Sequence, residues 1–334
     1  MSRHEVAERD LRDVAHLAHV QLLTPVPDDS AAYFTRMLGM VPVHAEGGSV
    51  FLRGVWDYEQ YCLQLTEAPQ PGIGRVALRA RSEAALHRRA AALAEAGLGK
   101  GWTGGFGHGP AYAFTDPDGH PFEIYYETTR YQPPPDLAAP MKNQPQRHRG
   151  VGAGVRRLEH VNLLARDVGR CRLALERSLG LQTNEIVMHD DAEEAGAWMS
   201  STIQGHEVIY TRDALRASGR LHHVAFWLDS RDEVLRVADL YQDQGVTIEA
   251  GPSRHTAVQS FYLYCYEPGG NRIEVTTGGY LVFDPDAPPV VWSADEWAGR
   301  AGWGHPLPVT FHTYGTPSAD AQATDAATTR EDSG

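Results

Sequence analysis

An internal repeat constrains the fold of this chain more than any other feature of its sequence. The segment "AHVQLL", from Ala18, returns as "EHVNLL" from Glu159, and "DPDGHPFEI", from Asp116, returns as "EPGGNRIEV" from Glu267. Similar segments that recur in the same order indicate two homologous halves. A chain of 334 residues has room for two domains of about 140 residues each. We therefore expect a duplicated architecture, in which differences between the copies show where the chemistry takes place.

Each half divides again into two units of one plan. A short apolar run, typical of a strand, opens each unit and is followed by a helix candidate and about three more strand-like runs. The opening runs span residues 17–24, 75–80, 158–165 and 221–228. The helix candidates begin near Asp29, Ser82, Asp167 and Ser230 and end at Gly39, Gly97, Gly180 and Gly245, as side-chain N-caps and left-handed C-caps predict. The predicted fold class is α+β, with four βαβββ units paired into two domains.

Shifts in composition set the predicted domain boundaries. Residues 130–154 are rich in Pro, Gln and Gly and lack periodicity, which is typical of a connection. We expect an N-terminal domain, a linker, a C-terminal domain with an extension, and a disordered tail, over residues 1–140, 141–156, 157–316 and 317–334. The extension carries Trp292, Trp297 and Trp303, and side chains of this size predict packing against the rest of the protein.

Charge and hydropathy narrow the classes of partner. Lys and Arg number 30 against 43 Asp and Glu, and the resulting net charge of -13 disfavours nucleic acids and anionic membrane surfaces. No run approaches the roughly 20 apolar residues that span a bilayer, and the N-terminus has no signal-peptide core. The three cysteines lack paired spacing, which predicts packing roles. We expect a cytoplasmic protein with a small-molecule partner.

Two histidines and one glutamate occupy matching frames in the second half. His160 and His223 lie in the opening runs of the third and fourth units, and Glu274 lies in the last strand-like run of the fourth. Two imidazoles and one carboxylate that leave positions open form the facial triad of non-haem Fe(II) oxygenases. Mn²⁺ tolerates the same ligands, and hydrolases bind Zn²⁺ with them. The sequence predicts a divalent metal site here, with iron preferred.

The repeat refines this ligand set. In "AHVQ", "EHVN" and "HHVA" the residue directly before Val is the shared one, which selects His223, and strand alternation places His222 on the opposite face. The first half retains His19 and Glu123 but has Arg75 where a second histidine is expected. Because arginine does not ligate cations, we expect the first half to be metal-free.

The stretch from His255 to Glu274, "HTAVQSFYLYCYEPGGNRIE", resembles the signature of the type I extradiol ring-cleavage dioxygenases of the vicinal oxygen chelate superfamily. The resemblance spans residues 11–316 and includes catechol 2,3-dioxygenases and homoprotocatechuate 2,3-dioxygenases. It implies two glyoxalase/bleomycin-resistance-like domains, assembly into a homotetramer, and Fe(II) held by the triad. The iron would bind a catechol and O₂, and the ring would open next to the diol to give a 2-hydroxymuconic semialdehyde-type product.

The resemblance also implies roles for residues outside the triad. His206 matches a histidine that stabilises bound oxygen species and moves a proton, a task suited to imidazole near neutral pH. His255 and Tyr264 match residues that hydrogen-bond a catecholate oxygen. Asn162 and Trp198 match pocket positions. Each of these five residues also has an ordinary alternative, as a core, strand-end or loop side chain.

The substrate class depends on arginines that hold a carboxylate in homoprotocatechuate enzymes. Ala250 stands at one of these positions, and a pair in the extension is reduced to Arg300, preceded by Gly299. The expected substrate is therefore catechol or an alkyl- or halo-substituted catechol, and Arg300 keeps homoprotocatechuate (3,4-dihydroxyphenylacetate) as the alternative. Two other classes of the superfamily are alternatives. A glyoxalase-like isomerase or thiol transferase would not need His206, His255 and Tyr264 together. A metal-free binding protein would lack the triad.

Overall fold

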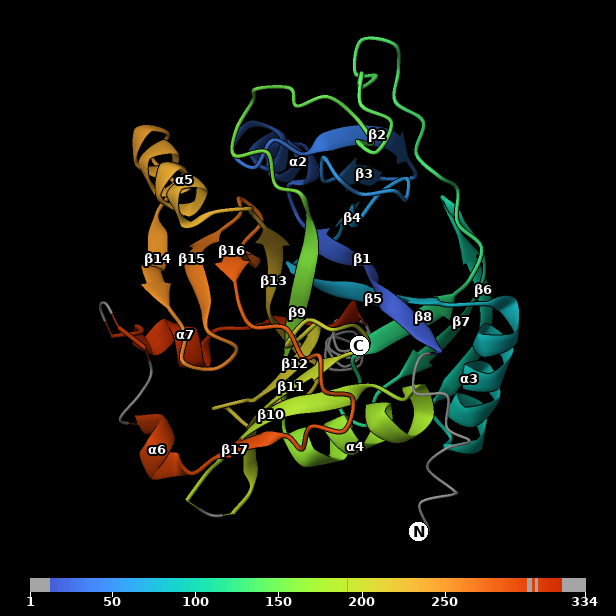
Figure 1. Ribbon diagram of the computed structural model, residues 1–334, viewed down its shortest axis with the longest axis vertical. Helices are drawn as coiled ribbons and strands as arrows, with labels where there is room; N and C mark the ends of the chain where they lie inside the picture. Colours follow the sequence, from blue (N-terminus) through green and yellow to red (C-terminus); the bar gives the residue numbers. More distant parts are fainter. Residues whose placement is uncertain (1–12, 191, 299–301, 304–305, 320–334) are drawn as a thin grey trace, which may run out of the picture.

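The computed structural model describes residues 13–190, 192–298, 302–303 and 306–319. Each half of the chain forms one curved sheet, and the two sheets lie side by side (Figure 1). The strand order is β2-β3-β4-β1-β5-β8-β7-β6 in the first sheet and β14-β15-β16-β13-β9-β12-β11-β10-β17 in the second. The predicted α+β class of paired βαβββ units is confirmed.

The first half contains two such units. The first unit comprises β1 (Val14–Thr24), α2 (Pro27–Arg36), β2 (Val41–Glu46), β3 (Ser49–Arg53) and β4 (Leu63–Glu67). The second comprises β5 (Gly72–Ala80), α3 (Glu83–Glu95), β6 (Gly99–Gly105), β7 (His108–Thr115) and β8 (Pro121–Tyr125). The opening strands β1 and β5 pair antiparallel at the centre of the sheet, and each pairs in parallel with the last strand of its own unit.

The second half repeats this plan. The third unit comprises β9 (Arg157–Ala165), α4 (Val168–Leu179), β10 (Gln182–Met188), β11 (Glu194–Ser200) and β12 (Val208–Arg212). The fourth comprises β13 (Arg220–Trp227), α5 (Arg231–Asp243), β14 (Ile248–Arg254), β15 (Ser260–Tyr266) and β16 (Arg272–Gly278). Here β9 and β13 form the central antiparallel pair.

Three of the four predicted helix starts are confirmed by side-chain caps. Ser82, Asp167 and Ser230 each accept a hydrogen bond from a backbone N–H in the first turn of their helix. The prediction at Asp29 is wrong, because α2 begins at Pro27 without a side-chain cap. Proline is favoured there, since its fixed φ suits the first helical turn and that turn needs no N–H from it.

Both central strand pairs, β1–β5 and β9–β13, contain β-bulges. The register of β9 against β13 slips at Glu159, and the register of β1 against β5 slips at the equivalent residue, Ala18. On the opposite strands the extra residues are His222 and Gly74. A bulge re-aims side chains next to it. The duplication has therefore kept the same backbone irregularities in both halves, although the side chains that they carry differ.

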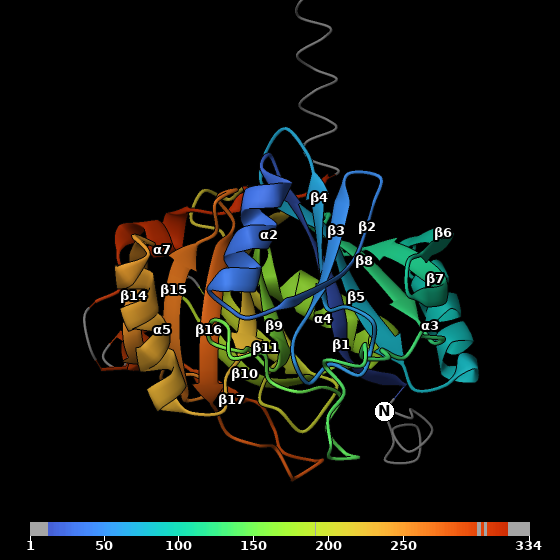
Figure 2. The same cartoon turned by 90° about the horizontal axis from the view of Figure 1, so that it is seen from above.

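The two halves share one hydrophobic core. Helix α2 lies between the two sheets (Figure 2), where Phe34 packs 5.8 Å from Phe226 between ring centroids. The Tyr33 hydroxyl lies 2.6 Å from that of Tyr241 on α5. Helix α3 of the first half and helix α4 of the second also lie side by side (Figure 1). The halves therefore fold against each other.

The repeated "DPDG" and "EPGG" loops join the halves. In the first loop, Asp116 accepts hydrogen bonds from the Tyr210 hydroxyl at 2.7 Å and from His120 Nδ1 at 2.7 Å. In the second, Glu267 accepts one from the Ser30 hydroxyl at 2.6 Å, and Asn271 donates to the Leu23 carbonyl at 2.9 Å. Each loop thus bonds to the opposite half, which gives this part of the repeat a structural role.

Residues 141–156, the predicted linker, contain no helix or strand. They pack against the end of α2, where the N–H groups of Ala153 and Val155 donate to the carbonyls of Met37 and Leu38 at 2.8 and 2.9 Å. All three cysteines are buried and free, as predicted. Among the described helices, none has the length and apolar character needed to cross a membrane.

The C-terminal extension packs onto the second half, as its tryptophans predict. It comprises β17 (Val290–Trp292), α6 (Ala294–Ala298), α7 (Val309–Thr313) and β18 (Thr316–Pro317). Strand β17 pairs with β10, and β18 pairs with β13. Ser318 forms a further bridge with Ile73. Ordered pairing thus extends into the predicted tail, whose remaining residues from 320 lie outside the described ones.

Candidate metal centre

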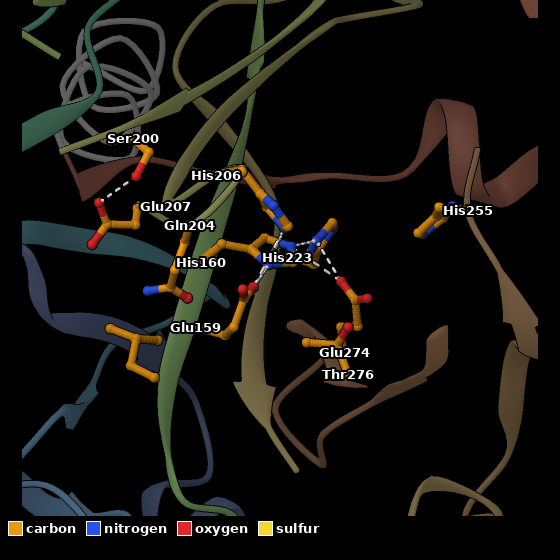
Figure 3. Close-up of polar contacts among 12 residues, drawn as sticks. Glu159, His160, Ser200, Gln204, His206, Glu207, His223, His255, Glu274 and Thr276 are labelled. Atoms are coloured by element: carbon orange, nitrogen blue, oxygen red, sulfur yellow. Dashed lines mark hydrogen bonds and ion pairs between the residues drawn. The ribbon is translucent and has the colours of Figure 1, made fainter. Parts of the chain in front are cut away.

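The three predicted metal ligands meet inside the second sheet. His160 on β9, His223 on β13 and Glu274 on β16 occupy three adjacent strands and are at most 2% exposed. The Nε2 atoms of His160 and His223 lie 3.1 and 3.0 Å from Glu274 Oε2 and 2.8 Å from each other. Figure 3 shows the two rings turned toward this carboxylate. The rigid strands thus present three ligand atoms to one point.

The surroundings of the Glu274 carboxylate indicate which kind of ion the three side chains can bind. Both of its oxygens are buried and have no hydrogen-bond partner. Buried carboxylates without partners are rare, because the loss of hydration is not offset. Burial alone would raise the pKa of Glu274, yet His160 and His223 hold that pKa well below its usual range. The three residues therefore fit a divalent cation, and their donor atoms suit iron, manganese or zinc.

Glu159, which the sequence reasoning missed, lies directly behind His160. Its Oε2 contacts His160 Nδ1, and it lies 3.4 Å from His206 Nε2. His160 would therefore ligate through Nε2 while Nδ1–H donates to a carboxylate, an arrangement that fixes the tautomer and the ring orientation of metal-binding histidines. Burial alone would raise the pKa of Glu159, but His206 and His160 hold it at about 2. The sequence did not reveal Glu159, because in a regular strand its side chain would point to the face opposite His160. The bulge at Glu159 brings the two side chains together.

His206 stands in the loop between β11 and β12 and is 3% exposed. Its Nε2 lies 3.1 Å from His160 Nδ1, and Figure 3 shows it beside the His160 and His223 rings. Burial lowers the pKa of His206 to about 4, although Glu159 opposes the shift. The imidazole is therefore neutral near pH 7 and free to accept a proton.

His255 and Tyr264 form a hydrogen-bonded pair next to the ligands. His255 Nε2 lies 2.9 Å from the Tyr264 hydroxyl, and the His255 ring stacks on Tyr262 at 3.9 Å between centroids. The Tyr264 ring in turn lies 5.1 Å from that of His223. His255 stands apart from the other histidines in Figure 3. Burial lowers the pKa of His255 to about 4 and, together with Glu274, raises that of Tyr264 well above its usual range.

His222 takes a different direction from His223. Its Nε2 lies 2.7 Å from the Phe311 carbonyl on α7, to which it donates, and its Nδ1 lies 2.6 Å from His223 Nδ1. As the bulged residue, it supports the ring of the predicted ligand and ties the extension to the sheet. The structure thus brings His223, not His222, to Glu274.

Of the remaining predicted residues, the structure describes Asn162 and Trp198. Asn162 pairs with His223 across the strands, and its Oδ1 is buried without a hydrogen-bond partner. Trp198 on β11 is half-buried, with its ring 5.8 Å from that of Trp297 in the extension. Arg300 lies outside the described residues.

An apolar cluster borders the His255–Tyr264 pair. Ala250 on β14 is 9% exposed and packs with Tyr262 and Tyr264, against Leu307 and Phe311 of the extension. Apolar walls with a few convergent polar groups are typical of small-molecule sites. Ala250, in this cluster, stands at a position where the family resemblance predicts a carboxylate-binding arginine in homoprotocatechuate enzymes.

Comparisons with known proteins agree with this geometry. Residues 157–275 match the model of the Glyoxalase/Bleomycin resistance protein/Dioxygenase superfamily. The chain is 38% identical to a metapyrocatechase of Geobacillus stearothermophilus, over 91% of this chain and 94% of that protein. It is 33% identical to a manganese-dependent 2,3-dihydroxybiphenyl 1,2-dioxygenase of Geobacillus genomosp. 3, over 85% and 91% of the two chains.

Solved structures give the same result. The homoprotocatechuate 2,3-dioxygenase of Brevibacterium fuscum, in complex with 3,4-dihydroxyphenylacetate, is similar with a TM-score of 0.81 and 27% identity, over 93% of this chain and 95% of that one. The enzyme from Arthrobacter globiformis has the same TM-score at 26% identity, over 93% and 94% of the two chains. Fold, site geometry and sequence identity over nearly the whole length therefore agree, and the chain belongs to the extradiol ring-cleavage dioxygenases of the vicinal oxygen chelate superfamily.

Proposed function

We propose that this enzyme cleaves catechol, or an alkyl- or halo-substituted catechol, with O₂ at the bond next to the diol, and that Fe(II) is its metal. The observation that carries the proposal is the buried triad of His160, His223 and Glu274, with its unpartnered carboxylate, beside the neutral imidazole of His206. Metapyrocatechase is another name for catechol 2,3-dioxygenase, and the relative of that name is 38% identical.

When bound, the metal would hold both reactants on one ion and lower the pKa of a coordinated catechol hydroxyl. His206 takes up a proton as the substrate reacts and passes it on to the product, and because burial favours its neutral form near pH 7 it holds that proton only transiently. Tyr264, held by His255 at 2.9 Å, donates a hydrogen bond to the catecholate oxygen. Glu159 keeps His160 and His206 in position through its contacts with both rings.

The side of the site next to Tyr264 favours a ring without an acidic substituent. Ala250 contributes a methyl group to an apolar cluster there, and burying a carboxylate against such a surface without a partner is costly. Homoprotocatechuate remains the second candidate, because solved structures that bind 3,4-dihydroxyphenylacetate share the fold at a TM-score of 0.81. Arg300 would then be the residue that holds its carboxylate.

A substrate panel tests the proposal. Protein loaded anaerobically with Fe(II) is mixed with air and with catechol, 4-methylcatechol, 4-chlorocatechol or 3,4-dihydroxyphenylacetate, and yellow product and O₂ uptake are measured. We expect the highest kcat/KM with one of the first three. A preference for 3,4-dihydroxyphenylacetate would favour the second candidate, and absence of coloured product with all four would refute extradiol cleavage.

Metal content and assembly are tested in parallel. Loading the metal-free protein with Mn²⁺ or Zn²⁺ under the same conditions shows whether Fe(II) supports the highest activity. His223→Ala is expected to lose the catalytic metal, whereas His189→Ala, at an exposed residue, should keep it.

We also propose a homotetramer, which light scattering after size exclusion measures directly.

A further inference from the structure

A second cluster of ligand-type side chains lies in the first half. His19 on β1, His108 on β7 and Glu123 on β8 place their ligand atoms within 4.8 Å of one another. The Nε2 atoms of His19 and His108 lie 3.2 and 3.6 Å from the same atom, Glu123 Oε1. The three side chains are at most 3% exposed. His108 has no histidine counterpart in the repeat, so the cluster did not emerge from the comparison of the two copies.

The carboxylate of this cluster resembles that of the second half. Glu123 Oε1 is buried and has no hydrogen-bond partner, as is true of the Glu274 oxygens. In both halves imidazole nitrogens face a carboxylate oxygen at 3.0 to 3.6 Å without forming a hydrogen bond with it. A buried oxygen in this state needs a partner. A cation held between the three groups would supply one.

The protons of the two imidazoles point the same way. His108 Nδ1 lies 2.8 Å from the Gly109 carbonyl, to which it must donate, so its Nε2 carries a lone pair toward Glu123. The Tyr125 hydroxyl donates its proton to Glu59, so only its oxygen lone pairs can meet His19 Nδ1 at 3.5 Å. His19 Nε2 is then also unprotonated. The Tyr61 hydroxyl lies 3.1 Å from His19 Nε2 and can donate to it, whereas the His108 lone pair and Glu123 Oε1 face each other without a hydrogen bond. A cation between the three groups would relieve this repulsion and take the place of the Tyr61 contact at His19.

Arg75 supplies part of that charge but leaves the cluster open. Its Nη1 donates to Glu123 Oε2 at 2.8 Å, whereas Oε1, the oxygen that faces both imidazoles, receives no hydrogen bond from it. The guanidinium replaces the missing second histidine of this half as a neighbour of the carboxylate. It would weaken a cation site through repulsion without occupying it.

We propose that His19, His108 and Glu123 bind a second divalent cation of the zinc class, separate from the metal of the second half. Neutral imidazoles with one carboxylate are ligands that Zn²⁺ prefers, and it binds nitrogen ligands more tightly than Fe(II) or Mn²⁺ does. The site would link β1, β7 and β8 and stabilise the first half. It revises the expectation that this half is metal-free, and it does not depend on the proposed reaction.

Zinc titration of the full-length, metal-free protein tests the proposal. Equilibrium dialysis with metal analysis should show about two Zn²⁺ per chain, the second bound more weakly. Glu123→Gln, which preserves the side-chain shape, should leave one, and the matched variant Glu274→Gln should lose the other. The double variant should bind none. Binding of a single Zn²⁺ by the unaltered protein, or two by Glu123→Gln, would overturn the proposal.

Two further variants separate ligation from folding. His108→Ala should also bind only one Zn²⁺, and combining it with Glu274→Gln should remove that one, which shows that the site of the second half is intact in His108→Ala. Arg75→Leu removes the nearby positive charge and should tighten the weaker site about tenfold or more. Unchanged affinity in Arg75→Leu, together with full zinc content in His108→Ala, would place the weaker zinc elsewhere and refute this ligand set.

Discussion

Glu159 and His160 are neighbours on one strand, yet their side chains meet, because Glu159 is the extra residue of a β-bulge and its Oε2 contacts His160 Nδ1. In a regular strand the two would point to opposite faces. The bulge therefore brings a carboxylate behind a predicted metal ligand. The equivalent bulge of the first half carries Ala18, which has no group to offer.

Replacing Glu159 by Gln should lower the activity of the metal-loaded enzyme or its metal affinity by about 10–100-fold, because the amide no longer fixes the imidazole tautomer as a carboxylate does. Metal affinity and kcat/KM are measured separately. Glu193→Gln, at an exposed ion pair, is the matched control and should change neither. Wild-type values for both quantities in Glu159→Gln would show that the contact has no role in the site.

His206→Ala should keep its metal and react slowly. The ring is next to His160 but is not part of the triad of His160, His223 and Glu274. Its loss should therefore leave metal binding nearly intact and reduce kcat by about 10²–10⁴-fold, as expected for loss of a general acid–base. Stopped-flow absorbance of the ring-opened product measures the rate. Full activity in this variant would refute the assigned proton transfer, and loss of metal would make His206 a ligand.

Tyr264→Phe tests the hydrogen bond to the substrate oxygen. Removing the hydroxyl that His255 holds at 2.9 Å should reduce kcat/KM by about 10-fold or more, with metal content unchanged. Tyr112→Phe, in the first half, is the matched control. The visible spectrum of the anaerobic catechol complex shows whether the catecholate is bound differently. An identical spectrum and identical kinetics would argue for a purely packing role of Tyr264.

The contact between Asp116 and His120 predicts a pH-dependent stability. Both side chains are fully buried. Burial acts against both charges, but the pair overcomes it, so the pKa of Asp116 is lowered and that of His120 is raised. Asp116 contributes stability above its unfolded pKa of about 4, and His120 contributes below its unfolded pKa of about 6.5, so the joint contribution is largest between these values.

Asp116→Asn should therefore cost about 3 kcal/mol near pH 5.5, and less as the pH rises through the pKa of folded His120 or falls through that of folded Asp116. Thermal unfolding of wild type and variant across this range gives the difference at each pH. Asp284→Asn, at an exposed turn, serves as the control. A difference in Tm that stays constant from pH 4 to 9 would show that the charges of the pair do not contribute.

The repeat predicted the fold because strand, cap and glycine signals recur in each unit. Ser82, Asp167 and Ser230 cap helices as expected, whereas α2 starts at a proline that needs no side-chain cap. The triad was also predictable, since its residues occupy shared frames. Two features were not: Glu159 depends on a bulge, which local alternation cannot reveal, and His108 reaches Glu123 from another strand without a counterpart in the second copy.

The two loops that reach into opposite halves affect how the chain is made. Synthesis delivers the first half early, yet Ser30 and the Leu23 carbonyl must wait for Glu267 and Asn271, which emerge 237 and 248 residues later. Glu274 follows only a few residues after them. The residues that bond to the first half and the last ligand of the triad are thus synthesised within the same short interval. A nascent chain cannot assemble the triad before Glu267 and Asn271 have been made.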